Sequence, residues 1–295
     1  MATRSRPRLG FIGPGTVGSA LARGLAAAGY SVALFGRRAE RLHRVLDRIP
    51  GGRRAASAQA LVEASDVVFL TVPDDAIRPA AESLAWGSGK SAVHCSGASS
   101  LDLLAHAAGQ GAAVGVFHPL QSFATAEQAE RNLPGSAFGI EASTEDLLSD
   151  LREMAASLGG TPLTVSGDKA IYHASAVFAS NYLVTLLDVA SGLWRALGLS
   201  QEDGLRALLP LVRGTIENLE TIGLPDALTG PIARGDVGTI ERHLSALAQV
   251  APDALPLYKE LARTAIPIAR AKGGLDEAAA ERVRELLNRR EGGGS

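Results

Sequence analysis

The chain has 295 residues, of which 46% are hydrophobic and 20% charged, a composition that excludes fibrous and intrinsically disordered proteins. Lys and Arg total 29 against 31 Asp and Glu, so the net charge of −2 offers no broad basic surface and argues against a nucleic-acid partner. At roughly 100–200 residues per domain, the length predicts two domains.

Three further features of the sequence bear on its compartment. The basic start before Arg8 is not followed by a long apolar run or a cleavage-like site, so we expect no signal peptide. No stretch approaches the roughly 18 consecutive apolar residues of a membrane helix, so we expect no membrane partner. Cys95 is the only cysteine and cannot form an internal disulfide. These features predict a soluble, cytoplasmic protein.

The first 165 residues alternate short apolar runs with longer periodic segments, which is typical of strands and helices around a parallel sheet. This pattern predicts an α/β domain over residues 1–165. The expected strands lie near residues 8–12, 31–35, 67–72, 91–95, 113–117, 137–141 and 162–165, and the expected helices at residues 16–28, 39–47, 75–84, 101–108 and 143–158.

A glycine-rich turn follows the first expected strand and opens the first expected helix. It has the G-x-G-x-x-G pattern of a Rossmann dinucleotide-binding domain. Its first glycine permits the tight turn, its second lets a pyrophosphate approach the backbone, and its third lets the helix pack on the strand. The alternative is a glycine turn that binds nothing. The residues expected to bind the cofactor here are Gly13, Pro14, Gly15, Thr16, Val17 and Gly18.

The second expected strand ends in Gly36, Arg37 and Arg38, where an NAD-binding domain would carry an acidic residue. Two guanidinium groups at this point suit the 2′-phosphate of NADP, which a carboxylate would repel. The sequence therefore predicts NADP(H) as the cofactor. The alternative is a solvated cluster of arginines with Arg41 and Arg44 on the next helix.

Three further segments lie at or beyond expected strand ends, where ligands bind in open α/β sheets. Val72 and Pro73, with His94 and Ser96, are candidates for cofactor binding. Ser96 is also a candidate for substrate binding, as is Gln121, and His118 is a catalytic candidate because histidine titrates near neutral pH. A histidine at a strand end is equally often a structural hydrogen-bonding group, and Cys95 is best explained as a buried thiol.

From residue 166 to residue 290 the strand-like runs stop, and the pattern predicts an all-helical domain for substrate binding and dimerisation. The segment 168–197 is apolar on nearly every face, which predicts a helix buried all round, in a bundle or at a subunit interface. We therefore expect a homodimer. Further helices are expected at residues 201–220, 237–250, 254–272 and 276–290, and a disordered tail at residues 291–295.

Polar residues interrupt the apolar segment 168–197 at helical spacing. Lys169, His173 and Ser180 lie along one stripe, with Asn181 further round. Such groups must satisfy one another or face a ligand. Lys169 could donate a proton to an oxyanion formed as hydride reaches a carbonyl carbon, or it could extend to solvent at the end of the helix.

A rigid, glycine- and proline-containing connection lies between two later helices. Arg234 is a candidate to bind a substrate carboxylate, and Thr229 to donate a hydroxyl hydrogen bond beside it. Asp236 is better explained as the N-cap of the following helix. None of these segments suggests a metal site.

These segments together resemble the Rossmann-like proteins that carry the helical domain DUF2520. Members of that group are similar to pyrroline-5-carboxylate reductase, 3-hydroxyacid dehydrogenases and ketopantoate reductase. The resemblance implies an NADPH-dependent reductase in which Lys169 matches the catalytic lysine, although the fourth residue after it is His173 where those enzymes have asparagine. The resemblance is carried by the glycine turn, His94–Gly97, Phe117–Phe123, Lys169…Tyr172-His173…Asn181-Tyr182 and Thr229…Asp236.

Three functions follow from the sequence. The first is reduction of a small 2-oxo acid carboxylate, foremost ketopantoate to pantoate, with Lys169 as proton donor and His118, His173 or Asn181 also placed in the catalytic site. The second is reduction of a C=N bond, as in pyrroline-5-carboxylate. The third is an NADP-binding sensor without turnover, which has no use for polar residues in a buried helix.

Overall fold

The computed structural model describes residues 5–289 and divides into two compact units, with the division of the chain between Ser180 and Asn181. The tail expected at residues 291–295 lies outside the described residues. The last strand ends at Thr164, and only helices follow from Lys169 onward. The first unit includes the first of these helices, so it extends beyond the boundary at residue 165 expected from the sequence.

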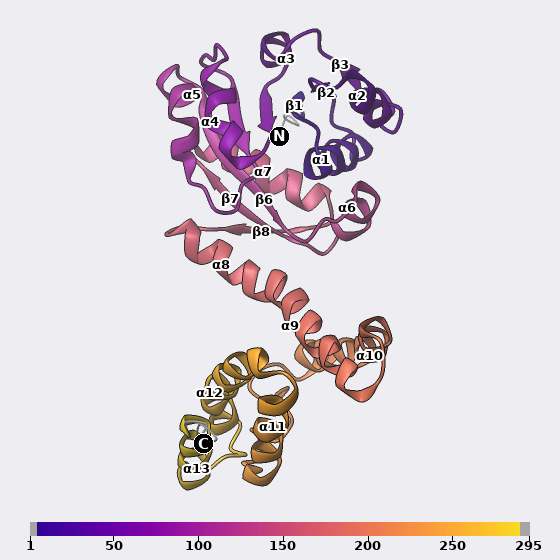
Figure 1. Ribbon diagram of the computed structural model, residues 1–295. Coiled ribbons are helices and arrows are strands. Elements are labelled where there is room, and N and C mark those ends of the chain that lie inside the picture. The colour runs from indigo at the N-terminus through magenta and orange to yellow at the C-terminus, as the bar shows by residue number, and fades with distance from the viewer. Residues whose placement is uncertain (1–4, 290–295) are drawn as a thin grey trace. The chain divides into compact units, whose positions relative to one another are not determined.

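The first unit is built on one eight-stranded sheet with the order β3-β2-β1-β4-β5-β6-β7-β8 (Figure 1). Strands β1 to β6 are parallel, β7 is antiparallel to β6, and β8 is parallel to β7. This sheet confirms the predicted α/β class and the Rossmann-like first domain. The strands are β1 (Leu9–Ile12), β2 (Val32–Phe35), β3 (Arg53–Arg54), β4 (Val67–Leu70), β5 (Ser91–His94), β6 (Ala113–Leu120), β7 (Ala137–Ala142) and β8 (Thr161–Thr164).

Two apolar cores hold helices on opposite faces of this sheet. Four phenylalanines run across one face, with successive ring centroids 4.8, 5.7 and 4.8 Å apart in the order Phe11, Phe69, Phe117, Phe138. The helices of that face are α1 (Thr16–Ala27), α2 (Ala39–Leu46), α6 (Ala126–Asn132) and α7 (Glu145–Ser157). The other face packs against α3 (Ala58–Ala64), α4 (Asp74–Glu82), the 3₁₀ turn Leu101–Leu104 and α5 (Ala105–Gly109).

The second unit is helical and has its own core. Helix α9 packs against α10, and a buried cluster that includes Ile240, Ile266 and Val283 joins α11, α12 and α13. The helices are α9 (Asn181–Gly192), a 3₁₀ turn (Leu193–Leu197), α10 (Gln201–Thr221), α11 (Val237–Val250), a 3₁₀ turn (Pro252–Ala254), α12 (Leu255–Ala271) and α13 (Glu277–Asn288).

Three short elements escaped the sequence prediction, namely β3, α3 and α6. Each has at most seven residues, too few to show a periodicity. The expected helix 168–197 is two helices, because α8 (Lys169–Ala179) ends at Ser180 and α9 begins at Asn181.

The apolar segment Lys169–Leu197 is not buried within the chain, and the prediction of a helix buried all round is wrong for the single chain. Its most apolar 18-residue window is only 6% buried, and Ile171 and Val184 are each 70% exposed. By length and composition alone the segment is apolar enough to cross a membrane, contrary to the sequence prediction. That prediction required consecutive apolar residues, whereas the mean hydropathy of 1.4 tolerates the interspersed Ser and Asn.

Candidate active site

The glycine turn between β1 and α1 is built around close backbone approaches. Gly13 has a φ of +77°, and a Cβ there would lie 2.5 Å from Cγ1 of Val72. A Cβ at Gly18 would lie 2.2 Å from Oγ1 of Thr71, whose hydroxyl donates to the carbonyl of Gly13 at 3.0 Å. The first and third glycines are therefore required by packing, and Thr71 fixes the turn to the end of β4.

Gly15 has a different reason to be glycine. A Cβ there would meet no atom closer than 3.9 Å, so the fold itself would accommodate a side chain. Gly15 is also the N-cap of α1, and no side chain caps the helix start. The free N–H groups and the partial positive charge of a helix N-terminus bind anions. The turn therefore fits a dinucleotide pyrophosphate, with Thr16 and Val17 in the first helical turn.

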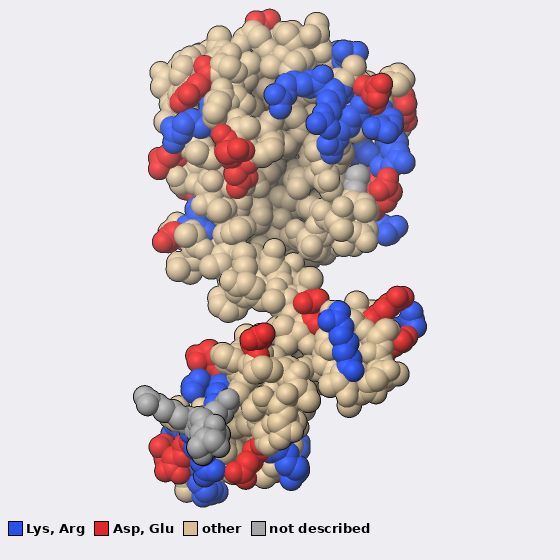
Figure 2. Space-filling model, in the orientation of Figure 1, with Lys and Arg blue, Asp and Glu red and all other residues tan. Residues whose placement is uncertain are grey.

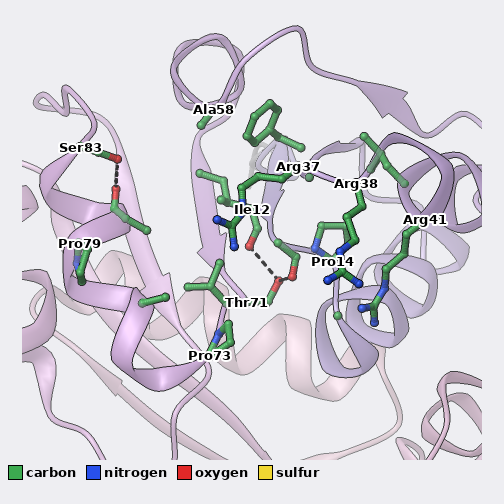
Figure 3. Close-up of a pocket in the computed structure, with 18 of the residues that line it drawn as sticks. Ile12, Pro14, Arg37, Arg38, Arg41, Ala58, Thr71, Pro73, Pro79 and Ser83 are labelled. Carbon is green, nitrogen blue, oxygen red and sulfur yellow. Dashed lines mark hydrogen bonds between the residues drawn. The ribbon is translucent and has the colours of Figure 1, made fainter.

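A cleft of about 670 Å³ opens between this turn and the ends of β2 and β4 (Figure 3). Arg37, Arg38 and Arg41 lie along its β2 side, and Pro14, Val72 and Pro73 also line it. None of the described residues that line the cleft is Asp or Glu. Arginine side chains gather on the surface over α2 (Figure 2). The cleft therefore suits the 2′-phosphate of NADP.

His94 is the last residue of β5, and the structure gives it a structural role. It is fully buried; its Nε2 donates to the carbonyl of Ser100 at 3.1 Å, and its Nδ1 accepts from the N–H of Ser96 at 3.2 Å. Burial lowers the pKa of His94, so the ring stays neutral near pH 7. Both nitrogens are occupied, so His94 shapes the loop and has no polar atom left for the cofactor that the sequence assigned to it.

Ser96 connects this loop to the start of α4. Its hydroxyl donates to Oδ2 of Asp74 at 2.7 Å and lies 3.0 Å from the hydroxyl of Ser99. The neighbouring Cys95 is a half-buried free thiol, and loss of solvent around it raises its pKa to about 12, so it is not poised as a nucleophile. The serines and Asp74 thus form the polar group at the ends of β4 and β5.

His118 lies within β6, which runs three residues further than predicted. Its Nδ1 lies 2.9 Å from the phenol oxygen of Tyr172 on α8, with the rings edge to face. A Cβ at Gly97 would lie 2.7 Å from Nε2 of His118, and one at Gly139 would lie 2.6 Å from the phenol oxygen of Tyr172. Two glycines therefore make room for this pair.

Lys169 is buried at the start of α8, with a relative exposure of 8%. Its Nζ donates to the carbonyl of Val165 at 2.5 Å and lies 2.7 Å from Oε2 of Glu141 on β7. That carboxylate oxygen is buried and has no partner in hydrogen-bond geometry among the described residues, so the contact is an ion pair. Lys169 therefore neither reaches solvent nor shares the exposed environment of His173.

The remaining candidates are separated by the division into two units. Ser180 is the C-cap of α8. Gln121 donates a hydrogen bond to Ser136 Oγ at 3.2 Å, within the segment that connects β6 to β7. Asp236 caps α11 by accepting from Thr239 N–H at 3.0 Å, as expected. The second unit holds Asn181, Thr229 and Arg234, all exposed.

Sequence reasoning left five residues out of its site, namely Arg41, Thr71, Asp74, Glu141 and Tyr172. Arg41 and Tyr172 carried a usable signal: Arg41 lies in the first turn of the helix that follows Arg37 and Arg38, and Tyr172 lies three residues after Lys169 on one helix. Glu141 carried none, since only the pairing of β7 with β6 brings it to Lys169. Within the described residues no cluster of three or more His, Cys, Asp or Glu could hold a metal ion.

Two known families match separate parts of the chain, and the second match begins inside the first unit. Residues 8–96 match the family described as "NADP oxidoreductase coenzyme F420-dependent". Residues 136–265 match the family described as "Domain of unknown function (DUF2520)". One curated relative, the probable 3-hydroxyisobutyrate dehydrogenase-like 2 of Arabidopsis thaliana mitochondria, is 45% identical over 69 residues. That match spans 23% of this chain and only 22% of the relative.

Solved structures with the same fold cover most of the chain. A Thermotoga maritima protein is 26% identical with a TM-score of 0.72, and the match covers 90% of this chain and 99% of that one. A putative NADP oxidoreductase from Bacteroides fragilis is 24% identical, with a TM-score of 0.68 and coverage of 89% and 98%. A 1-pyrroline-5-carboxylate reductase from Streptococcus pyogenes is 17% identical, with a TM-score of 0.62 and coverage of 95% and 99%.

The arginines of the cleft lead to the first prediction. Changing both Arg37 and Arg38 to Ala should weaken NADPH binding by about 1–3 kcal/mol and NADH binding much less, because only NADPH carries the 2′-phosphate. Fluorescence titration of both cofactors measures the difference. Changing the exposed Arg53 and Arg54 of β3 to Ala is the control and should affect neither cofactor. Equal weakening of NADPH and NADH would make Arg37 and Arg38 ordinary surface charges.

The buried histidine of β6 leads to a second prediction. Burial and the nearby His173 lower the pKa of His118 from 6.5 to about 4, so below pH 6.5 the unfolded chain binds a proton that the folded chain excludes. The free energy of unfolding should therefore fall between pH 6.5 and pH 4, by up to about 3 kcal/mol from this residue. Urea unfolding at several pH values gives the slope of the free energy of unfolding against pH. This slope should be shallower for His118→Gln than for the wild type. His43→Gln, at a side chain that is 80% exposed, should keep the wild-type slope; identical slopes for all three proteins would contradict the assignment.

Proposed function

The chain joins an NADP oxidoreductase domain to a DUF2520 domain, and we propose that it is an NADPH-dependent reductase of a C=O or C=N bond in a small carboxylate. The observation that carries this proposal is the cleft that begins at the uncapped start of α1 and is lined by Arg37, Arg38 and Arg41. In open α/β sheets a dinucleotide lies across such strand ends, with its reacting half on the far side of the glycine turn.

Bound NADPH would supply the hydride, and the side chains of the protein would bind and orient the cofactor and the substrate. The arginines at β2 hold the phosphate-bearing adenosine half, which directs the other half toward the ends of β4 and β5. The groups there are Ser96, Asp74, His118 and Tyr172. In this proposal Ser96 orients the substrate, and Gln121 and Ser180 of the first unit remain candidates to bind its polar groups. For Asn181, Thr229 and Arg234 of the second unit, substrate binding stays a prediction from the sequence, with the guanidinium of Arg234 as the group suited to a carboxylate.

The choice of substrate lies between two chemistries. The family resemblance favours a 2-oxo acid, with ketopantoate as the first compound to test. The ion pair of Lys169 with Glu141 removes one reason for that choice, because a lysine engaged in this way is poorly placed to protonate an alkoxide. Reduction of a C=N bond requires no lysine for that step. The likeness to a pyrroline-5-carboxylate reductase concerns the fold alone, so this second substrate class rests on the state of Lys169.

A substrate panel tests the proposed function. NADPH oxidation is followed with ketopantoate, other 2-oxo acids, pyrroline-5-carboxylate and simple cyclic imines, with the Arg37 and Arg38 double variant as a cofactor-site control. Turnover that depends on one of these classes and weakens in the variant is the expected result. NADPH binding without turnover on any compound would instead support the NADP-binding sensor.

We also propose that the chain forms a homodimer in the cytosol. Each unit exposes large apolar side chains: Ile171 on α8 of the first unit, and Val184 on α9 and Leu211 on α10 of the second, between 66% and 70% exposed. Large apolar side chains exposed in this way on each unit are typical of an interface in a soluble protein. The single cysteine is compatible with a reducing compartment.

The proposed homodimer leads to a further prediction. Light scattering at micromolar concentration should give twice the mass of one chain. Val184→Glu and Leu211→Glu together should shift the mass toward the monomer, because two carboxylates would be buried in the interface. A wild-type monomer would remove the homodimer from this account.

A further inference from the structure

The pair formed by His118 and Tyr172 lies at the edge of the sheet where we place the reaction, and the backbone closely surrounds it. Its two partners come from β6 and α8, and the distance of 2.9 Å is that of a hydrogen bond. Gly97 and Gly139 leave space that a single methyl group on either would fill. The backbone at these two glycines therefore approaches the His118 and Tyr172 side chains more closely than any other residue type would allow.

Lys169 lacks what a proton donor at this position needs. Its Nζ donates to the carbonyl of Val165 and is paired by charge with Glu141, and the side chain is almost fully buried. To reach a substrate it would have to leave Glu141, which would leave an unpaired carboxylate partly buried. Its ion pair instead ties the first turn of α8 to β7, one turn before Tyr172.

The direction of the hydrogen bond between His118 and Tyr172 is set by the tautomer of His118. The ring of His118 is neutral near pH 7 and carries one proton. If that proton is on Nδ1, the N–H donates to the phenol oxygen, and the phenol hydrogen is free to point at a ligand. The Nε2 atom then faces Gly97, where no donor is needed. In this arrangement the N–H of His118 also stabilises a phenolate.

We propose that Tyr172, held by His118, is the proton donor of the reduction and that Lys169 is a positioning residue. The proposal rests on the proposed function. As the substrate carbon receives hydride, the π electrons of its C=O or C=N bond move to the heteroatom, which takes the proton of the Tyr172 hydroxyl. The product is the alcohol or amine with the oxidised cofactor, and the phenolate recovers its proton from water.

The chain contains a matched control for this pair. Tyr258 lies 3.0 Å from Nδ1 of His243 in the second unit, with the rings edge to face as in the first pair. Tyr172→Phe should lower kcat by about 10²- to 10⁴-fold and leave the Kd for NADPH within about twofold, whereas Tyr258→Phe should leave both unchanged. Normal turnover of Tyr172→Phe overturns the proposal.

A conservative variant distinguishes a positioning role of Lys169 from a role as proton donor. Arginine can pair with Glu141 but is too weak an acid to protonate a substrate. Lys169→Arg should therefore keep most of the activity, while Lys169→Met should lose activity and melting temperature together. Loss of activity in Lys169→Arg with an unchanged melting temperature would return the donor role to the lysine.

A measurement without turnover keeps the proposal testable if the panel yields no substrate. Phenolate absorbance, as the difference between wild type and Tyr172→Phe, gives the pKa of Tyr172. Burial raises that pKa in the free protein, and the positive ring of NADP⁺ nearby should lower it on binding. The pKa of Tyr258 should not move. An unchanged pKa of Tyr172 places it away from the cofactor and overturns the proposal, whereas the lowered pKa without turnover counts against the proposed reaction alone.

Discussion

The in-register parallel pairing of the central strands determines where everything else in the first unit lies. Ile12 pairs with Leu70, Leu70 with His94, and His94 with Val116, so β1, β4 and β5 end at one level, and β6 continues just beyond it. The glycine turn, the start of α4, the serine loop and His118 therefore share one edge of the sheet. Without this alignment, residues so far apart in sequence could not form a single site.

The parts of this account that the sequence predicts are those with a local cause. Gly13 and Gly18 are required by contacts with Val72 and Thr71, and the strand, turn and helix pattern around them is complete in ten residues. Arg37 and Arg38 directly follow β2, so their place in the cleft is likewise predictable from the local sequence. Glu141 has no local signal, because β7 reverses direction and only then brings its carboxylate to Lys169.

The apolar segment around Ser180 shows the limit of reasoning from one chain. Its composition predicts a segment that is covered on every side, but nothing in the pattern says by what. Within the chain the segment is exposed. Helical spacing puts Lys169 and His173 on one stripe, but Lys169 is buried against Glu141 and His173 is exposed. A buried ion pair of this kind specifies a geometry more than it adds stability.

The central claim is that one dinucleotide bridges the arginines of β2 and the tyrosine of α8. A crystal structure of the full chain with NADP⁺ tests it most directly. The account predicts the 2′-phosphate within hydrogen-bond distance of Arg37 or Arg38, the pyrophosphate at the N–H groups after Gly15, and the nicotinamide beside Tyr172. A 2′-phosphate directed to solvent, or a nicotinamide bound away from Tyr172, would contradict it.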